Sequence, residues 1–322
     1  MRVIALPGEK GGIGKTTTTV NLGAALVEMD RRVLLLDTDP QASCSRSVGV
    51  SVSDPTCSLY AALAGQASLA DLIVESPTCN LFVVPAHRRL ATLGVEITVH
   101  PDTRLRKALS VLPDDAYDYV LIDCPPRLDL LPINALTAAG EVLIPLTLEV
   151  LPTHTLPTLM RTVNEVRTFG DNSGLRVLGI VPCRTTRGRT RLEREIRRLL
   201  PQLVGLPIYS GIRKAEVVRQ SPGRKLPVVL YASRHPAAED FRRLAREVDW
   251  GLEAARAWEE PRKRQADPAA PVTGSKAQPG SPVPEMCADA PEDSREASPE
   301  PGTVAAAPAG AVPAVEGGAR SR

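Results

Sequence analysis

Aromatic residues are scarce in this chain: Phe, Trp and Tyr together make up 3% of its 322 residues. This scarcity disfavours base stacking on exposed rings as a way of binding nucleic acid. The six cysteines form no C-x-x-C pair and have no histidine at metal-ligand spacing, which favours reduced thiols that act as small apolar residues. No apolar run is long enough to span a membrane, and no charged-then-apolar segment precedes the first apolar run. We therefore expect a cytoplasmic protein.

The C-terminal stretch lacks large apolar residues altogether. From Pro261 onward there is no Leu, Ile, Phe, Tyr or Trp, and eleven residues are proline. A segment of this composition cannot bury enough apolar surface to offset the entropy lost on ordering it. We therefore expect one folded domain over residues 1–258 and a disordered tail, rich in Pro, Ala, Gly, Ser and Glu, over residues 259–322.

Net charge is formally +2, which by itself indicates no partner. Its distribution is uneven, because residues 184–225 hold twelve Lys or Arg against three Asp or Glu. Such a patch attracts polyanions, and since Tyr209 is its sole aromatic residue, we expect contact with phosphates. A solvated arginine-rich face is the alternative. The residues that we assign to DNA phosphates are Arg187, Arg189, Arg191, Arg194, Arg213, Lys214, Arg219 and Arg224.

A glycine-rich loop lies between the apolar run Val3 to Leu6 and a long helical pattern rich in Ala and Leu. This order of strand, loop and helix lets successive backbone N–H groups and the helix dipole face an anion. Lys15 would supply a charge to the β- and γ-phosphates, and the Thr16 hydroxyl would ligate Mg²⁺. We assign the phosphates of a nucleoside triphosphate to the residues Gly11, Gly12, Ile13, Gly14, Lys15, Thr16 and Thr17.

That loop departs from the usual pattern G-x-x-x-x-G-K-[ST]. Glu9 stands where the first glycine belongs, and a second lysine, Lys10, follows it. As a solvated loop residue Lys10 would need no explanation, so its role depends on the family resemblance given below.

Short apolar runs alternate with helical patterns along the rest of the folded part. This alternation predicts an α/β fold: a doubly wound, mostly parallel sheet with helices on both faces. The expected strands are residues 33–36, 81–84, 119–123, 142–146 and 175–181, with weaker signals at 207–209 and 227–230. The expected helices are residues 17–29, 154–168, 189–200 and 236–258.

Carboxylates follow two of these strands. Asp37 and Asp39 come directly after one strand and before Pro40, and Asp123 ends another. Because ligands sit at the carboxyl ends of the strands in open α/β sheets, these positions suit a metal site. Asp123 would hold Mg²⁺ through a water molecule. A structural role as a cap of the following segment is the alternative for both Asp39 and Asp123.

Three motifs together resemble the ParA/MinD family of ATPases. They are KGGIGKTT in the loop, Asp37-Thr-Asp-Pro-Gln in the first switch segment, and Asp123-Cys-Pro-Pro in the second. The resemblance implies that Lys10 reaches the nucleotide of a partner subunit and that Asp39 orients the attacking water. It also implies that Asp37 supports the Mg²⁺ shell, so the expected metal residues are Thr16, Asp37 and Asp123, and the expected catalytic residues are Lys10, Lys15 and Asp39.

The sequence departs from the family pattern at three positions. In the second switch segment, Arg127 replaces the usual Ser and Asp129 replaces the usual Gly. Later in the chain, Lys225 stands where the family has Gly. A side chain in place of glycine restricts the backbone. The family's contacts on the adenine side therefore cannot be transferred by residue.

The resemblance implies a partition ATPase that uses ATP and Mg²⁺. It would form a homodimer with ATP and bind DNA non-specifically at the nucleoid. It would release the DNA after slow hydrolysis stimulated by a ParB-like centromere-binding protein.

One alternative is a MinD-like membrane-cycling regulator. Such relatives end in a basic amphipathic helix, whereas this chain ends in Pro- and Ala-rich sequence, so we expect no membrane partner. An ATPase that positions a protein cargo is a second alternative. A small-molecule kinase or ligase would leave the arginine patch unexplained.

Overall fold

The computed structural model describes residues 1–96, 99–148, 155–186 and 190–255. The tail expected over residues 259–322, and the predicted DNA contacts Arg187 and Arg189, lie outside this part of the chain. Among the described residues no helix is both long enough and apolar enough to cross a membrane.

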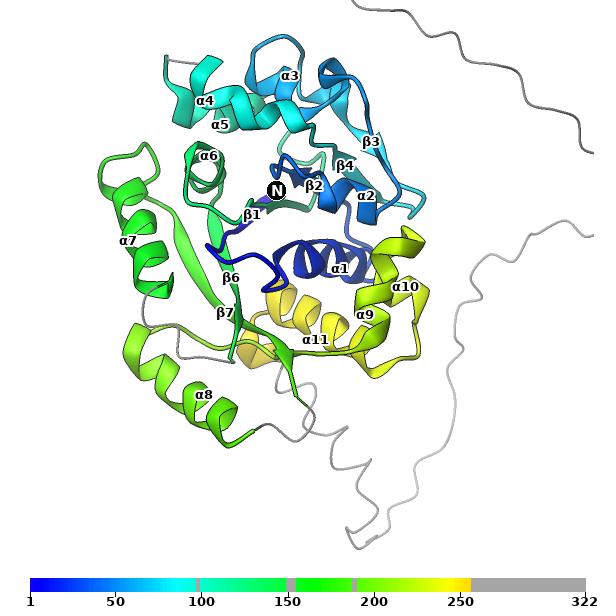
Figure 1. Ribbon diagram of the computed structural model, residues 1–322, viewed down its shortest axis with the longest axis vertical. Coiled ribbons are helices and arrows are strands. Elements are labelled where there is room, and N and C mark those ends of the chain that lie inside the picture. Colours follow the sequence, from blue (N-terminus) through cyan, green and yellow to red (C-terminus); the bar gives the residue numbers. More distant parts are fainter. Residues whose placement is uncertain (97–98, 149–154, 187–189, 256–322) are drawn as a thin grey trace, which may run out of the picture. The chain divides into compact units, whose positions relative to one another are not determined.

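The described residues form an eight-stranded sheet in the order β3-β4-β2-β5-β1-β6-β7-β8 (Figure 1). Neighbouring strands are parallel except for β3 and β4. The strands are β1 (Arg2–Leu6), β2 (Val33–Asp37), β3 (Val74–Glu75), β4 (Leu81–Val84), β5 (Tyr119–Asp123), β6 (Glu141–Thr147), β7 (Arg176–Thr185) and β8 (Ile212–Arg213). The predicted doubly wound α/β fold is therefore confirmed.

Eleven α-helices are present within the described residues. They are α1 (Lys15–Val27), α2 (Ser43–Ser47), α3 (Leu59–Leu63), α4 (Leu93–Glu96), α5 (Arg104–Leu109), α6 (Leu130–Ala138), α7 (Thr155–Thr168), α8 (Arg191–Val204), α9 (Glu216–Gln220), α10 (Val228–Tyr231) and α11 (Pro236–Trp250). A short 3₁₀-helix, η5 (Ser221–Arg224), joins α9 to the segment before α10.

The sheet separates two hydrophobic cores because successive strand residues point to opposite faces. In β2, Leu34 and Leu36 belong to the core that α3, α5, α6, α7 and α8 cover. Val33 and Leu35 belong to the other core, where α1 and α11 lie side by side (Figure 1). Gly23 lets α1 approach this face closely, since a Cβ there would come 3.0 Å from Leu35 Cδ2.

The two weaker strand predictions have different outcomes. Residues 207–209 contribute only an isolated bridge between Ile208 and Ile180. The prediction of a strand at residues 227–230 is wrong, because this segment forms α10. The amide of Val228 donates to Asn21 Oδ1 on α1 (2.5 Å), and Val228 is fully buried. Packing against α1 therefore overrides the strand preference of consecutive valines.

A polar network ties the amino ends of the central strands to α11. Arg2 donates to Glu141 Oε2 (2.9 Å) and to the Tyr119 hydroxyl (3.0 Å). That hydroxyl donates to Asp249 Oδ1 (2.6 Å), which also accepts from Arg31. The network lies at the edge opposite the carboxyl ends, where the candidate site is found.

Candidate nucleotide-binding site

The glycine-rich loop and the predicted carboxylates meet at the carboxyl edge of three adjacent strands. Leu6, the last residue of β1, pairs with Asp123 at the end of β5. On its other side, Asp123 pairs with Asp37 at the end of β2. The strand order thus gathers segments that are far apart in the sequence, as the positions of the motifs predict.

The loop enters α1 through a residue that must be glycine. Gly14 is the N-cap of α1 with φ 101° and ψ 16°, in the left-handed region that side chains disfavour. A Cβ at Gly14 would also lie 3.3 Å from Cys183 Cβ and Sγ on β7. The first N–H groups of α1 consequently remain accessible to an anion.

Two lysines of the loop face different surroundings. Lys15 is buried, and its Nζ donates to the carbonyl oxygen of Lys10 (3.0 Å). Burial lowers the pKa of Lys15, although the negative charge of Asp123 opposes that shift. The side chain of Lys10 is exposed and forms no ion pair with the described residues. One lysine therefore points into the site and the other is open to a partner.

Thr16 and Asp123 form the centre of the predicted metal site. The Thr16 hydroxyl donates to Asp123 Oδ2 (2.7 Å), and the Thr19 hydroxyl reaches Asp123 Oδ1 (3.4 Å). Asp123 is fully buried, so desolvation and the neighbouring Asp37 raise its pKa well above the ordinary value. A divalent cation would favour the ionised form of this carboxylate.

Asp37 is turned toward α2. Its Oδ2 accepts from the amide and the hydroxyl of Ser45 (2.8 and 2.7 Å), and its Oδ1 accepts from the amide of Asp39 (3.2 Å). Desolvation raises the pKa of Asp37 to about 6, although the hydrogen bonds from Ser45 oppose the shift. The direct role of Asp37 in the metal shell stays a prediction; the observed role is to hold α2 against β2.

Asp39 lines the cavity described below and also caps a turn. Its Oδ1 accepts from the amide of Gln41 (2.9 Å), and its carbonyl oxygen accepts from the amide of Ala42 (2.8 Å). Among the described residues Asp39 Oδ2 has no hydrogen-bond donor. One oxygen thus holds the turn, and the other is available to a water molecule.

A cavity of about 450 Å³ opens over the loop. The loop residues from Gly11 to Thr18, without the buried Ile13, and Asp39 line one side. The other side combines the apolar residues Ile212, Ala215, Val218 and Pro222 with the basic residues Arg184, Arg213, Lys214 and Arg219. The volume falls in the range of small-molecule sites, and the division between loop amides and apolar side chains suits a phosphate chain joined to a base. The described residues contain no cluster of three or more Asp, Glu, His or Cys that would hold a metal by themselves. This fits Mg²⁺, which commonly takes one or two protein oxygens together with substrate phosphates and water.

Sequence reasoning missed three residues of this region. The amide and the hydroxyl of Thr38 both donate to the carbonyl oxygen of Asp123 (3.1 and 2.7 Å), which joins the two switch segments. Ser45 holds Asp37, and Arg184 lies on the cavity wall with Nη1 3.4 Å from the carbonyl oxygen of Gly12. No sequence pattern marks Ser45 or Arg184. Thr38 lies inside the first switch motif, but the motif does not reveal its bonds to Asp123.

The second switch segment accommodates its departure from the family pattern. Asp129, in place of the usual glycine, is the N-cap of α6, with φ −104° and an oxygen that accepts from the amide of Leu131. A negative φ is unstrained for aspartate. Within α6, Asn134 Oδ1 accepts from the amide of Leu105 (3.1 Å) and fixes α6 against α5.

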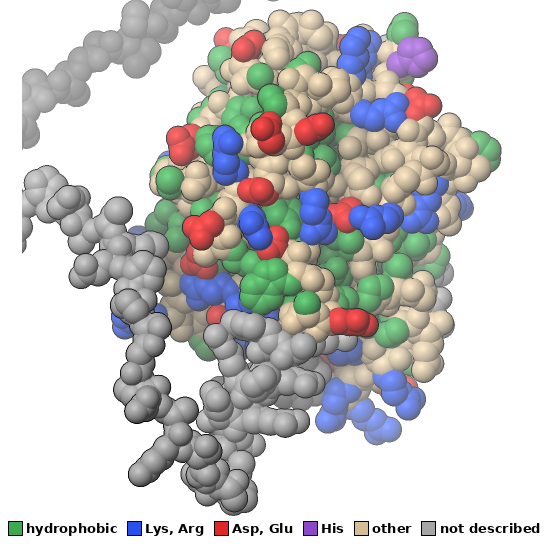
Figure 2. Space-filling view, turned by 180° about the vertical axis from the view of Figure 1, so that it is seen from behind, with side chains coloured by type: hydrophobic (Ala, Val, Ile, Leu, Met, Phe, Trp, Pro, Cys, Tyr) green, Lys and Arg blue, Asp and Glu red, His purple; other side chains and the backbone are tan. Residues whose placement is uncertain are grey.

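Some of the predicted DNA-contacting residues are exposed cations without an ion pair among the described residues, and others form ion pairs with carboxylates of the fold. Arg191 and Arg194 are exposed on α8, whose N-cap is Thr190, with Oγ1 accepting from the amide of Glu193. Figure 2 shows Lys and Arg side chains gathered at the lower right, where α8 lies once the view of Figure 1 is turned. Lys214 and Arg224 are also exposed.

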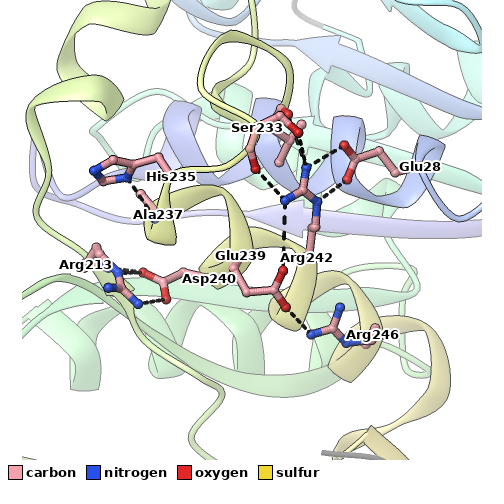
Figure 3. A network of polar contacts seen from close by, with 10 residues as sticks. Glu28, Arg213, Ser233, His235, Ala237, Glu239, Asp240, Arg242 and Arg246 are labelled. Atoms are coloured by element: carbon pink, nitrogen blue, oxygen red, sulfur yellow. Dashed lines mark hydrogen bonds and ion pairs between the residues drawn. The ribbon is translucent and has the colours of Figure 1, made fainter. Parts of the chain in front are cut away.

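Arg213 and Arg219 face carboxylates. Arg213 donates through Nε and Nη2 to Asp240 of α11 (2.6 and 2.7 Å), as Figure 3 shows. Arg219 pairs with Glu216 at the surface (3.1 Å). Because Asp240 is buried and accepts two bonds from its guanidinium, Arg213 is less accessible to a phosphate than the arginines of α8. Its DNA contact stays a prediction.

Comparisons with known proteins agree with this geometry. A family model described as an AAA domain matches residues 1–177. The chromosome partitioning protein ParA of Caulobacter vibrioides is 37% identical over 252 residues, which are 77% of this chain and 94% of that protein. The sporulation initiation inhibitor protein Soj of Bacillus subtilis is 36% identical over 253 residues, which are 77% of this chain and 98% of that protein.

Solved structures show the same architecture. Cobyrinic acid a,c-diamide synthase from Mycobacterium smegmatis, with a bound ATP analogue and magnesium, has a TM-score of 0.69 at 30% identity and covers 82% of this chain and 97% of its own. The cell division ATPase MinD of Pyrococcus furiosus has a TM-score of 0.62 at 28% identity and covers 77% of this chain and 98% of its own.

The strand–loop–helix geometry, the inward lysine and the Thr16–Asp123 pair define a P-loop nucleoside triphosphatase. Within that class, the chain belongs to the ParA/Soj family of ATPases.

Proposed function

We propose that this protein is a DNA-partitioning ATPase that alternates between a DNA-bound dimer with ATP and a released form after hydrolysis. The observation that carries the proposal is the opposite placement of the two loop lysines: Lys15 is buried in the site and Lys10 is exposed beside it. A P-loop that binds one nucleotide needs only the inward lysine. In the proposed dimer the outward lysine would reach a second nucleotide, held by a partner subunit.

The residues of the site have distinct tasks in ATP hydrolysis. Lys15 would exchange the carbonyl oxygen of Lys10 for phosphate oxygens, and the loop amides would bind the phosphate chain. Thr16 would ligate Mg²⁺, with Asp123 orienting its hydroxyl. Mg²⁺ neutralises charge on the phosphates, and Asp39 would orient the attacking water through its available oxygen. Phosphoryl transfer depends mainly on such positioning and charge stabilisation.

The exposed arginines of α8 supply the proposed contact with DNA. Arg191 and Arg194 have no carboxylate partner among the described residues, so their charges are available to phosphates. Closing two subunits would join two such surfaces and increase the avidity for a polyanion. Binding would be non-specific, and it would weaken as salt rises because phosphate contacts release counterions. A ParB-like partner that stimulates hydrolysis would then set the lifetime of the bound state.

The test measures assembly and DNA binding in parallel. With ATP and Mg²⁺, the full chain should sediment as a dimer and bind DNA of unrelated sequences equally, whereas with ADP it should stay monomeric and bind weakly. Lys10→Ala should abolish the dimer while retaining ATP binding, and Lys107→Ala, an exposed lysine on α5, is the matched control. A Lys10→Ala protein that dimerises normally would remove the proposed role in trans. ATP-dependent pelleting with anionic vesicles, without DNA binding, would instead favour the membrane-cycling alternative.

A further inference from the structure

A second cleft, of about 480 Å³, lies between α2 and η5, beside the nucleotide cavity. Arg46 and Ser47 line it from α2, Ser51 from the turn that follows, and Gly223 and Lys225 from the end of η5. No Asp or Glu is among the residues that line it. The cleft therefore presents cations, hydroxyls and backbone, with no carboxylate to neutralise them.

The cleft holds two cations that come from different segments of the fold, α2 and the end of η5. Arg46 and Lys225 are exposed, and neither forms an ion pair with the described residues. Many other arginines of the fold do: Arg2 faces Glu141, Arg31 faces Asp249, and Arg242 faces Glu28. Two cations that share a cleft without a carboxylate repel each other, and an anion between them would remove that repulsion.

The backbone of Lys225 adds an independent observation. Lys225 has φ 57° and ψ 30°, the left-handed conformation in which glycine is unstrained. Its Cβ lies close to the turn after α2, since a Cβ added to Gly49 would be 3.7 Å from it. The chain thus keeps a long cation at a position where glycine would fit better. This conformation is unfavourable for a residue with a Cβ, so the surrounding structure fixes the direction in which Lys225 leaves the backbone.

The cleft is also connected to the first switch segment. Ser43 and Pro222 line both this cleft and the nucleotide cavity. Ser43 begins α2, and Ser45 in the same helix holds the carboxylate of Asp37 (2.7 Å). A ligand bound at Arg46 therefore contacts the helix that follows Asp39.

We propose that Arg46 and Lys225 bind a phosphate group in this cleft. A phosphate oxyanion would accept hydrogen bonds from the guanidinium and the ammonium group, with the serine hydroxyls as further donors. The phosphate belongs either to the DNA backbone or to a free phosphorylated small molecule. If the phosphate belongs to DNA, the proposed DNA contact of α8 extends to the cleft beside α2, and this case rests on the proposed function. If it belongs to a small molecule, the site is independent of the proposed function.

The experiment compares Arg46→Ala, Lys225→Ala and the double variant with the full-length wild type. Arg88→Ala and Lys107→Ala, exposed cations elsewhere on the fold, are the matched controls. The first measurement is DNA affinity with ATP and Mg²⁺ over a series of salt concentrations. The second is calorimetric titration of pyrophosphate into protein saturated with ADP and Mg²⁺, so that the P-loop is already filled. Lys225→Gly, which removes both the charge and the strain, should behave as Lys225→Ala does.

For a DNA phosphate we expect the double variant to lose about one unit of the slope of log affinity against log salt, and about tenfold in affinity at moderate salt. Loss of pyrophosphate binding with unchanged DNA affinity would assign the site to a small phosphorylated ligand. A wild type that binds no DNA, yet binds pyrophosphate through Arg46 and Lys225, would refute the proposed function and leave this site standing. If the double variant matches the wild type in both measurements, the site does not exist.

Discussion

The Thr16 hydroxyl donates to Asp123 Oδ2 across 2.7 Å and joins the first turn of α1 to the last residue of β5. The two residues are 107 positions apart in the chain. They meet because β1 and β5 are neighbours in register, with Leu6 opposite Asp123. A single hydrogen bond thus connects the loop that would bind phosphate to the strand that would orient the metal.

Two substitutions at Thr16 distinguish the effect of its hydroxyl group from the effect of its side-chain shape. Thr16→Val keeps the branched side chain but removes the proposed ligand for Mg²⁺ and leaves the buried Asp123 with one donor fewer. We expect Mg²⁺-dependent ATP hydrolysis to fall about 100-fold, because a catalytic metal contributes several kcal/mol to stabilising the transition state. Thr16→Ser, which keeps the hydroxyl, should stay within a few-fold of the wild type. Steady-state hydrolysis at varied Mg²⁺ measures both, and equal loss in the two variants would contradict the assignment.

One substitution can distinguish the proposed catalytic role of Asp39 from its observed role as a turn cap. Asp39→Asn keeps an oxygen to accept from the amide of Gln41, so the turn should persist while the negative charge is lost. We expect hydrolysis to fall by about 100-fold or more with little change in ATP affinity, since positioning and activating a nucleophile is worth that much. Asp39→Ala should add a loss of thermal stability. Wild-type hydrolysis in Asp39→Asn would show that Asp39 is only a turn cap.

Asp249 should make the stability of the fold depend on pH. Burial raises the pKa of Asp249, but hydrogen bonds from Arg31 and Tyr119 outweigh it and hold the pKa below its ordinary value. The stabilisation is therefore present above the ordinary pKa of about 3.9 and is lost as pH falls through the lowered value. Asp249→Asn should reduce the free energy of unfolding by roughly 2 kcal/mol at pH 7, the worth of hydrogen bonds to a charged group.

Urea unfolding from pH 7 to pH 3 measures this effect. The difference between wild type and Asp249→Asn should shrink toward pH 3. Asp171→Asn is the control, because Asp171 pairs with Arg106 at the surface and is 72% exposed, so its loss should cost less than about 1 kcal/mol. A difference for Asp249→Asn that stays constant with pH would disprove the charge-dependent contribution.

Ala42 offers a stabilising substitution. It precedes α2 with φ 52° and ψ 37°, a left-handed conformation that costs a residue with a Cβ roughly 1–2 kcal/mol. Ala42→Gly removes this strain but increases the entropy of the unfolded chain, so we expect a net gain of about 0.5–1 kcal/mol. In Ala62→Gly, inside α3, the same change should instead destabilise by about 0.5–1 kcal/mol. Thermal unfolding of the two variants tests the contrast, and two losses would contradict it.

The sequence predicted the parts of the fold that depend on local pattern. Buried strands such as residues 33–36 and 119–123 are continuous apolar runs, and the helix over residues 154–168 has helical periodicity. The strand β8 was missed because it has only two residues, Ile212 and Arg213, and no pattern of that length is informative. The error at residues 227–230 arose from a tertiary contact, the bond from Val228 to Asn21, which local sequence does not encode.

In the candidate site, too, local motifs were predictable from the sequence and contacts between distant segments were not. The loop residues and Asp123 were predictable because a motif fixes their spacing and the parallel sheet fixes their edge. Pairings between distant segments were not predictable. Arg213 donates to Asp240, and Asp37 accepts from Ser45, because the fold packs their segments together, and no motif encodes the spacing of either pair. The exposed Lys10 was recognised by resemblance, and its outward position is a finding of the structure.

The carbonyl oxygen of Asp123 accepts two hydrogen bonds from Thr38, one from its amide and one from its hydroxyl. These bonds hold the ends of β2 and β5 together, so a displacement of one strand end would move the other or break the bonds. Thr38 lies beside Asp39, and Asp123 accepts from Thr16, so a movement here would shift the residue proposed to orient water together with the proposed metal ligand. We therefore expect the two halves of the site to assemble together when nucleotide binds.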